Sequence, residues 1–283
     1  MAKAAVNGIT LEYESFGDPK NTTVLLINGL GSQMTRWPEA FCQLLVARGL
    51  RAVRFDNRDV GLSTWLPAGA AYRTEDMAAD CAGLLDHLGV AKAHIVGMSM
   101  GGMIAQTVAS DFPERTLSLT TIMSNTGRPD LPQPTPEAWA VISQPAPDPK
   151  AGLEVFLDHQ VKNAETIGSP AYPWPPGGLR ERALAEYTRA FNPPGVARQM
   201  AAIRASGDRR PKVRTITAPT VVLHGADDPL VPVEGGRDTA ACIPGAELRV
   251  IPGMGHDLPP ALYSIFIEAI MRAVERAGAR TPA

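Results

Sequence analysis

The residues with the clearest capacity for chemistry lie at positions 97–102, where the sequence reads GMSMGG. This matches the G-x-S-x-G pattern, in which a serine occupies a sharp turn between a strand and a helix. The apolar run 93–96 and the helix-forming run 103–109 supply that context. Flanking glycines avoid Cβ clashes, so Ser99 is expected to project outward as a nucleophile. The alternative is a glycine-rich turn with a buried serine, and the partner residues must decide between the two.

A serine hydroxyl becomes a good nucleophile when a histidine accepts its proton and an acid orients that histidine. His256 follows the last predicted strand, in a glycine-rich loop that can bend toward Ser99. It is therefore the expected base. Structural or solvated roles are expected for the other four histidines, which are His87, His94, His159 and His224.

Two neighbouring carboxylates compete for the role of the acid. In the order serine, acid, histidine, the strand end that follows Ser99 offers no carboxylate, whereas the loop 225–228 offers both Asp227 and Asp228. We favour Asp228, which directly precedes a proline. Asp257, beside the histidine, is expected to stabilise its loop or to be exposed.

The negative charge of a tetrahedral intermediate needs backbone N–H donors. The expected donors are the N–H groups of Met100, which follows the serine, and of Leu30, in the loop after an early strand. Gly29 and Gly31 allow that backbone to approach closely. The candidate residues of the substrate pocket are Gly29, Ser32, Trp37, Met98 and Met254. Trp37 suits the core equally well, and core packing is the commoner role for methionines of this kind.

The elements that must position these groups follow an alternating order. An amphipathic hairpin with its turn at residues 7–8 opens the chain. Strand patterns follow at 23–27, 51–55, 93–96 and 117–123, and helical patterns at 37–49, 75–88 with Thr74 as N-cap, and 103–109. This order predicts an α/β fold with a mostly parallel central sheet, an N-terminal antiparallel hairpin and helices on both faces. The Ser99 turn then lies at the carboxyl edge of a central strand, where such sheets bind ligands.

Prolines interrupt this rhythm from residue 129 onward, and strand patterns return only at 220–223 and 247–251. A short helix is expected to start at Pro136, and further helical patterns cover about 151–166, 179–190 and 195–206. We therefore predict a core formed by residues 1–129 and 213–283, with a helical cap at 130–212 inserted after the sixth strand. A final amphipathic helix near residues 266–274 is expected to dock on the sheet.

Composition excludes several classes of function. The 27 basic and 29 acidic residues give a net charge of −2 without a dense basic run, so neither nucleic acid nor an anionic membrane is an expected partner. The three cysteines are widely spaced, which is typical of core residues in a reducing, cytoplasmic protein. No signal peptide, metal cluster, phosphate loop or dinucleotide fingerprint is evident, so no cofactor is expected. A homo-oligomer remains compatible with the sequence.

Five stretches together make the chain resemble the α/β-hydrolase superfamily, and in detail the bacterial serine esterases of the aclacinomycin methylesterase and cofactor-free haloperoxidase type. They are residues 28–31, 55–63, 97–102, 225–228 and 253–256. In related chains the G-x-x-D spacing of the fourth stretch carries the acid. Asn28 departs from the histidine that the family often has at that position. The turn 56–63 is expected to support the structure, with Arg58 ion-paired.

The resemblance implies a serine carboxylesterase that forms an acyl-enzyme with a small-molecule ester, small to medium in size and largely apolar. Peracid formation of the haloperoxidase type and lactone hydrolysis are alternative uses of the same residues. A ligand-binding homologue without catalysis is a third alternative, against which the complete set of catalytic residues argues.

Overall fold

A computed structural model describes residues 1–150 and 152–279. Its centre is an eight-stranded sheet in the order β1-β2-β4-β3-β5-β6-β7-β8. The strands are β1 Ala2–Val6, β2 Ile9–Phe16, β3 Thr23–Ile27, β4 Arg51–Phe55, β5 Ala93–Met98, β6 Thr116–Ile122, β7 Thr220–Gly225 and β8 Glu247–Ile251. The β1–β2 and β2–β4 pairs are antiparallel and all other pairs are parallel. The predicted hairpin and mostly parallel sheet are confirmed.

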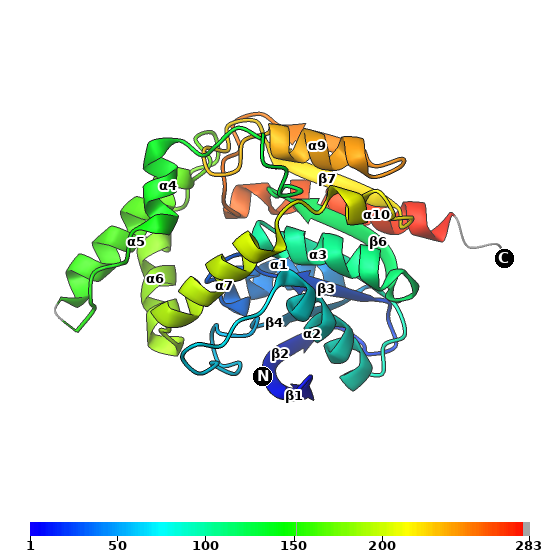
Figure 1. Cartoon of the computed structure of the whole chain (residues 1–283), viewed down its shortest axis with the longest axis horizontal. Helices are drawn as coiled ribbons and strands as arrows, with labels where there is room; N and C mark the ends of the chain where they lie inside the picture. Colours follow the sequence, from blue (N-terminus) through cyan, green and yellow to red (C-terminus); the bar gives the residue numbers. More distant parts are fainter. Residues whose placement is uncertain (151, 280–283) are drawn as a thin grey trace.

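Helices cover both faces of the sheet (Figure 1). On one face lie α2 Thr74–His87, α3 Met100–Asp111, α8 Arg210–Val213 and α9 Glu234–Cys242, and on the other lie α1 Glu39–Val46 and α10 Tyr263–Gly278. Strand β3 is fully buried because helices cover both faces of the sheet, to which its alternate residues point. Leu25 and Ile27 enter the core beneath α2 and α3, while Val24 and Leu26 enter the core beneath α1 and α10.

Two helix starts differ from those predicted. The helix expected from Trp37 begins at Glu39, because Trp37 precedes Pro38, and the residue before a proline is disfavoured in helical conformation. Thr74 is the first residue of α2 and not its N-cap, which is Arg73. The N–H of Thr74 instead donates to the Ser206 hydroxyl at 3.0 Å, so a contact from a distant helix satisfies a helix-end donor.

The segment between β6 and β7 carries four helices: α4 Pro136–Ser143, α5 Leu153–Ile167, α6 Gly178–Arg189 and α7 Pro193–Ser206. They extend beyond the sheet on the left of Figure 1. The insertion after the sixth strand and its four predicted helices are therefore present. Thr135 caps α4, its hydroxyl accepting the N–H of Ala138 at 3.2 Å, and a proline follows it at the first helical position.

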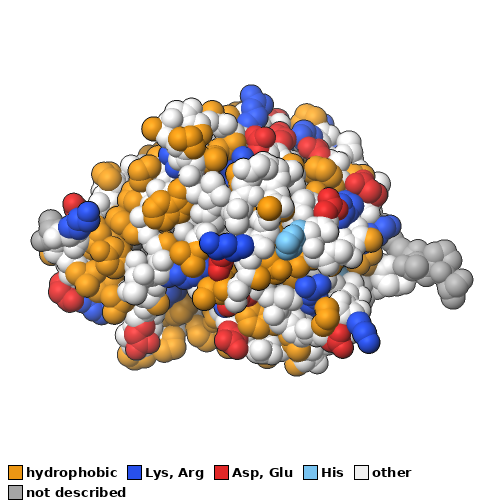
Figure 2. Space-filling view, turned by 90° about the horizontal axis from the view of Figure 1, so that it is seen from below, with side chains coloured by type: hydrophobic (Ala, Val, Ile, Leu, Met, Phe, Trp, Pro, Cys, Tyr) orange, Lys and Arg blue, Asp and Glu red, His pale blue; other side chains and the backbone are white. Residues whose placement is uncertain are grey.

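The core and the insertion expose different kinds of side chain. Figure 2 shows acidic and basic side chains interspersed over one face, with hydrophobic side chains gathered on the left, over the inserted helices. Four large hydrophobic side chains on α4, α5 and α6 are exposed: Trp139, Leu153, Val155 and Leu184. None of the helices in the described ranges combines the length and apolarity needed to span a bilayer.

Candidate active site

The turn between β5 and α3 holds Ser99 in a rare backbone conformation. Its φ is 55° and its ψ is −124°, outside the regions that L-residues ordinarily occupy. The flanking glycines make this turn possible. A Cβ on Gly97 would lie 2.0 Å from the carbonyl oxygen of Gly101, and one on Gly101 would lie 2.2 Å from that of Ile27. The turn is thus built so closely against strand β3 that only glycine fits.

Ser99, His256 and Asp228 lie in one hydrogen-bonded row at the carboxyl edge of the sheet. Ser99 follows β5, Asp228 follows β7 and His256 follows β8. The Ser99 Oγ is 2.9 Å from His256 Nε2, and His256 Nδ1 is 2.7 Å from Asp228 Oδ2. Because an ionised carboxylate only accepts hydrogen bonds, Nδ1 carries the proton and Nε2 is left to accept from the serine. This arrangement suits proton transfer from Ser99.

Asp228 is held more firmly than its neighbour Asp227. Its side chain is wholly buried, and Oδ1 accepts backbone N–H groups from Leu230 at 2.9 Å and Val231 at 2.8 Å. The opposite oxygen is therefore presented to His256. Asp227 is exposed and accepts the N–H of Gly253 at 2.7 Å, which ties the acid loop to the histidine loop. The structure thus brings Asp228 into the row and places Asp227 outside it.

The other buried histidines have structural partners. His94 Nδ1 lies 2.8 Å from the Ser118 hydroxyl, and burial lowers the pKa of His94 to about 4. His224 lies 3.6 Å from Asp228, but its Nε2 donates to the carbonyl of Val231 at 2.7 Å. Burial also lowers the pKa of His224. Both side chains are therefore neutral near pH 7.

The expected oxyanion donors flank the serine. A Cβ on Gly29 would lie 3.2 Å from Ser99 Cβ, so the loop after β3 touches the nucleophile. Within the described ranges, the N–H groups of Leu30 and Met100 donate to no other group of the protein. Two unsatisfied donors beside a nucleophile are what an oxyanion hole requires. Their role in catalysis stays a prediction.

The candidate pocket residues divide into two groups. Gly29 and Ser32 belong to the loop beside Ser99, where the Ser32 hydroxyl lies 3.4 Å from the Leu30 carbonyl. Trp37, Met98 and Met254 pack in the core on the α1 and α10 side, and Trp37 packs against Phe41 in a tilted arrangement with ring centroids 5.2 Å apart. Trp37 and Met254 have no exposed surface. Trp37 and Met254 are therefore core residues, the alternative that the sequence left open for them.

The end of α5 and the segment that follows it hold the histidine loop through hydrogen bonds. The N–H of His256 donates to the carbonyl of Ile167 at 2.7 Å, and the N–H of Gly255 donates to the Ser169 hydroxyl at 2.9 Å. Asp257 accepts from the Ser169 hydroxyl and, at 2.9 Å, from the indole N–H of Trp174. Burial raises the pKa of Asp257. Asp257 therefore stabilises its loop, one of the two roles predicted for it.

The turn 56–63 is a polar junction between the sheet and the insertion. Arg58 is ion-paired as predicted, through bonds of 2.7 and 2.8 Å to the Asp80 carboxylate. The fully buried Asp59 accepts two bonds from Arg198 of α7, at 2.9 and 2.7 Å. Asp56 accepts the N–H of Met34 at 2.7 Å and lies 2.7 Å from Arg189 of α6. This turn joins α6 and α7 to the loop after β3.

The sequence did not predict which residues of the inserted helices contact the core at this junction. Arg189, Arg198 and Gln199 lie on helices whose pattern predicted only a cap. A usable signal was present, because acidic side chains directly after an apolar strand need cationic partners once buried. Within the described residues, no group of histidine, cysteine or acidic side chains has a geometry that could hold a metal ion.

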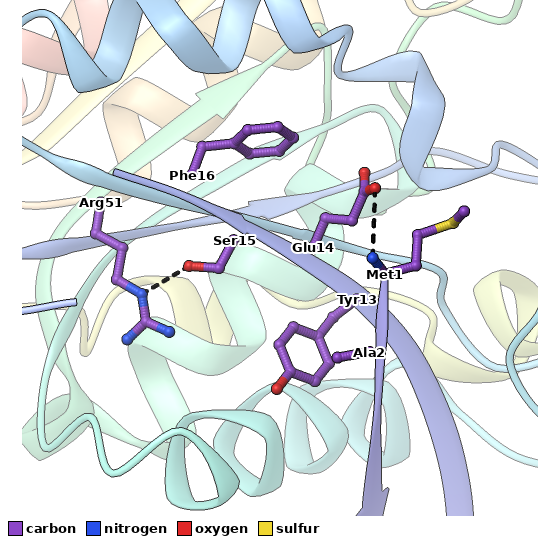
Figure 3. A pocket seen from close by; sticks show the side chains of 7 residues that line it. All are labelled: Met1, Ala2, Tyr13, Glu14, Ser15, Phe16 and Arg51. Carbon is purple, nitrogen blue, oxygen red and sulfur yellow. Dashed lines mark hydrogen bonds and ion pairs between the residues drawn. The ribbon is translucent and has the colours of Figure 1, made fainter. Parts of the chain in front are cut away.

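A separate surface hollow of about 350 Å³ lies far from Ser99. Figure 3 shows the seven residues that line it, including Arg51, which donates to the Ser15 hydroxyl at 2.8 Å, and Glu14, 3.8 Å from the chain's amino group. Arg51 begins β4, so the hollow opens at the amino end of a parallel strand, whereas Ser99 lies at the carboxyl edge. It therefore contributes no residue to the candidate active site.

Fold and site define an enzyme of the α/β-hydrolase class, and comparison with known proteins agrees. A model of the α/β hydrolase fold family matches residues 22–259, and the chain belongs to that family. Rhodomycin D methylesterase from Streptomyces peucetius is 31% identical over 285 residues, covering 93% of this chain and 94% of that protein. The expected family, fold and enzymatic class, that of a hydrolase, are thereby confirmed.

Two further relatives mark the breadth of the family. A protein of Mycobacterium tuberculosis, named as a candidate non-heme bromoperoxidase, is 30% identical over 258 residues, covering 88% of this chain and 91% of that protein. The meta-cleavage product hydrolase from Pseudomonas fluorescens IP01 superposes with a TM-score of 0.79 at 20% identity, covering 98% of each chain. At that identity the solved structure supports the fold alone.

Proposed function

We propose that the chain is a serine carboxylic ester hydrolase that acts through an acyl-enzyme. The observation that carries this proposal is the row in which His256 lies 2.9 Å from the Ser99 hydroxyl and 2.7 Å from the Asp228 carboxylate. Its similarity to rhodomycin D methylesterase favours an ester over an amide. Core residues 1–129 and 213–283 would supply the reacting groups, and the cap at 130–212 would cover them.

In this mechanism the Ser99 hydroxyl attacks the ester carbonyl while its proton passes to His256 Nε2. The N–H groups of Leu30 and Met100 stabilise the oxyanion that forms. Collapse of the intermediate expels the alcohol, which takes the proton from His256, and leaves the acyl group on Ser99. Water then attacks the acyl group, His256 accepts and returns its proton, and the carboxylic acid leaves. Asp228 orients the imidazole and stabilises its charged form.

The test is labelling with an alkyl fluorophosphonate followed by peptide mapping, together with hydrolysis of p-nitrophenyl and methyl esters. We expect phosphonylation of Ser99 alone and loss of ester turnover in Ser99→Ala. Thr121, whose buried hydroxyl lies beside Gly102 of the turn, provides a matched control as Thr121→Val, which should retain labelling. A label on another residue, or unchanged turnover in Ser99→Ala, would refute the proposal.

A second candidate is peracid formation from hydrogen peroxide and a carboxylic acid by the same three residues. The relative named as a candidate non-heme bromoperoxidase favours testing it. Peroxide would replace water in attacking the acyl group on Ser99. Incubation with acetate and peroxide should then produce peracetic acid in the wild type and none in Ser99→Ala, and its absence in both would leave ester hydrolysis as the only activity proposed for this site.

A further inference from the structure

A single glutamine of the inserted helices reaches the loop that carries the expected oxyanion donor. Gln199 lies on α7 and has no exposed surface. Its Oε1 accepts the N–H of Gly31 at 2.8 Å, and its Nε2 donates to the carbonyl of Arg58, also at 2.8 Å. Both hydrogen-bonding groups of the amide are thus used, one on each of two core loops. A buried amide satisfied in this way fixes what it contacts.

The bond to Gly31 holds the peptide that decides the shape of the oxyanion loop. The N–H of Ser32 donates to the Gly29 carbonyl at 3.2 Å, which closes a four-residue turn over residues 29–32. Gly31, third in this turn, has a φ of 64°, the mark of a type II turn. Types I and II differ by rotation of the central peptide by roughly 150°. In this turn the rotating peptide carries the Gly31 N–H.

From the side of the inserted helices, Gln199 supplies the hydrogen bond that holds this peptide. A Cβ on Gly31 would lie 3.0 Å from Val196 Cγ2, so the preceding turn of α7 packs directly on the loop. On the core side, Asp56 accepts the N–H of Met34 at 2.7 Å and fixes the other end of the segment. Leu30, the expected donor, directly precedes the first of these two anchors.

We propose that Gln199 is a positioning residue whose amide locks the Leu30–Gly31 peptide, and thereby the backbone beside the expected oxyanion donor. This inference rests on the proposed ester hydrolysis. Gln199 touches no reacting atom and acts through the loop. Without its amide, the Gly31 N–H loses its acceptor and the Leu30–Gly31 peptide is free to rotate, which loosens the adjoining backbone that carries the Leu30 N–H.

The expected consequence is selective for the transition state. Removing a whole oxyanion donor typically lowers kcat by about 10²–10³-fold. A mobile donor retains part of that effect, so Gln199→Met, of similar length without an amide, should lower kcat by about 10–100-fold. The KM for the ester should change by less than about threefold, because ground-state binding does not use the oxyanion hole.

The experiment compares ester kinetics with inhibition by an alkyl trifluoromethyl ketone, which adds to the serine and places an oxyanion in the hole. For Gln199→Met we expect the inhibition constant to rise by the same factor by which kcat falls. Gln199→Glu keeps the acceptor for Gly31 and should lose less than Gln199→Met, and it also serves as the second variant should Gln199→Met fail to fold. Arg198→Met is the matched control, because it weakens docking of α7 without contacting the oxyanion loop.

The outcomes separate this inference from the proposed function. If Arg198→Met lowers the melting temperature but leaves the ratio of inhibition constant to KM unchanged, while Gln199→Met raises that ratio at least tenfold, the positioning role is supported. If Gln199→Met keeps kcat and inhibition within threefold of the wild type, or if Arg198→Met reproduces its effect, the inference is overturned alone. If the wild type neither hydrolyses esters nor binds the ketone, the proposed function fails, and this inference fails with it.

Discussion

Replacing Gly101 with alanine tests how tightly the serine turn is built against the sheet. The new Cβ would lie 2.2 Å from the carbonyl oxygen of Ile27, whereas Cβ atoms in proteins essentially never come closer than 3.0 Å to such an atom. Helix α3 and strand β3 must therefore separate by about 0.8 Å at this point. Neither side can yield easily, because the obstacle is backbone of a strand paired on both sides, with β4 and β5.

The cost divides between stability and catalysis. Overpacking of a close-packed core costs typically about 1–3 kcal/mol, and we expect Gly101→Ala to lie at the upper end of that range. Because α3 begins at Met100, the shift also moves an expected oxyanion donor and the serine itself. A misplacement on the order of 1 Å lowers turnover by about 10²-fold.

Urea unfolding and ester kinetics measure the two effects on the same preparation. Gly278→Ala is the matched control, since nothing lies within 4 Å of the added Cβ at this helical position and alanine there should be neutral or stabilising by up to about 1 kcal/mol. If Gly101→Ala unfolds at the same urea concentration as the wild type and its kcat/KM stays within threefold of the wild-type value, the claim that only glycine fits this turn would be wrong.

Three further outcomes follow from the described contacts. Asp59→Asn leaves Arg198 without its buried partner and should lower the free energy of unfolding by about 3 kcal/mol, measured by urea denaturation. Burial lowers the pKa of His94 from 6.5 to about 4, so protonation of this side chain favours the unfolded chain. The free energy of unfolding should therefore be highest above pH 6.5 and should fall by about 3 kcal/mol on acidification through pH 4. Urea denaturation of His94→Asn should lack this part of the pH dependence. Asp228→Asn should lower kcat by about 10⁴-fold through the wrong imidazole tautomer, while Asp227→Asn, outside the row, should keep kcat near the wild-type value; equal losses in both would contradict the assignment of the acid.

The sequence was sufficient for the core of the fold because the strands show either a continuous apolar run, as in β3, or an alternation of apolar and polar residues, as in β2. Strands β3 and β4 have the predicted bounds, and the turn around Ser99 has the predicted strand before it and helix after it. The order of Ser99, Asp228 and His256 also placed all three at strand ends. Local pattern is informative here because each signal is contained in a few consecutive residues.

The junction between insertion and core was not predictable in the same way. Arg189, Arg198 and Gln199 are separated by more than 120 positions from their partners near Asp56 and Asp59, and a helical pattern does not specify where a helix docks. Thr74 shows the same limit on a smaller scale. Its type suggested an N-cap, but a distant hydroxyl on Ser206 satisfies its N–H and places it inside the helix.

The hydrogen bonds that join the histidine loop to the end of α5 and the segment after it set limits on how this enzyme could be redesigned. Because Ile167 and Ser169 accept the N–H groups of His256 and Gly255, deleting the whole insertion would leave the backbone of the histidine loop without its acceptors. A minimal enzyme lacking the insertion should therefore lose order at His256. Libraries aimed at new substrates are better confined to α4 and the exposed face of α5, leaving residues 167–174 unchanged.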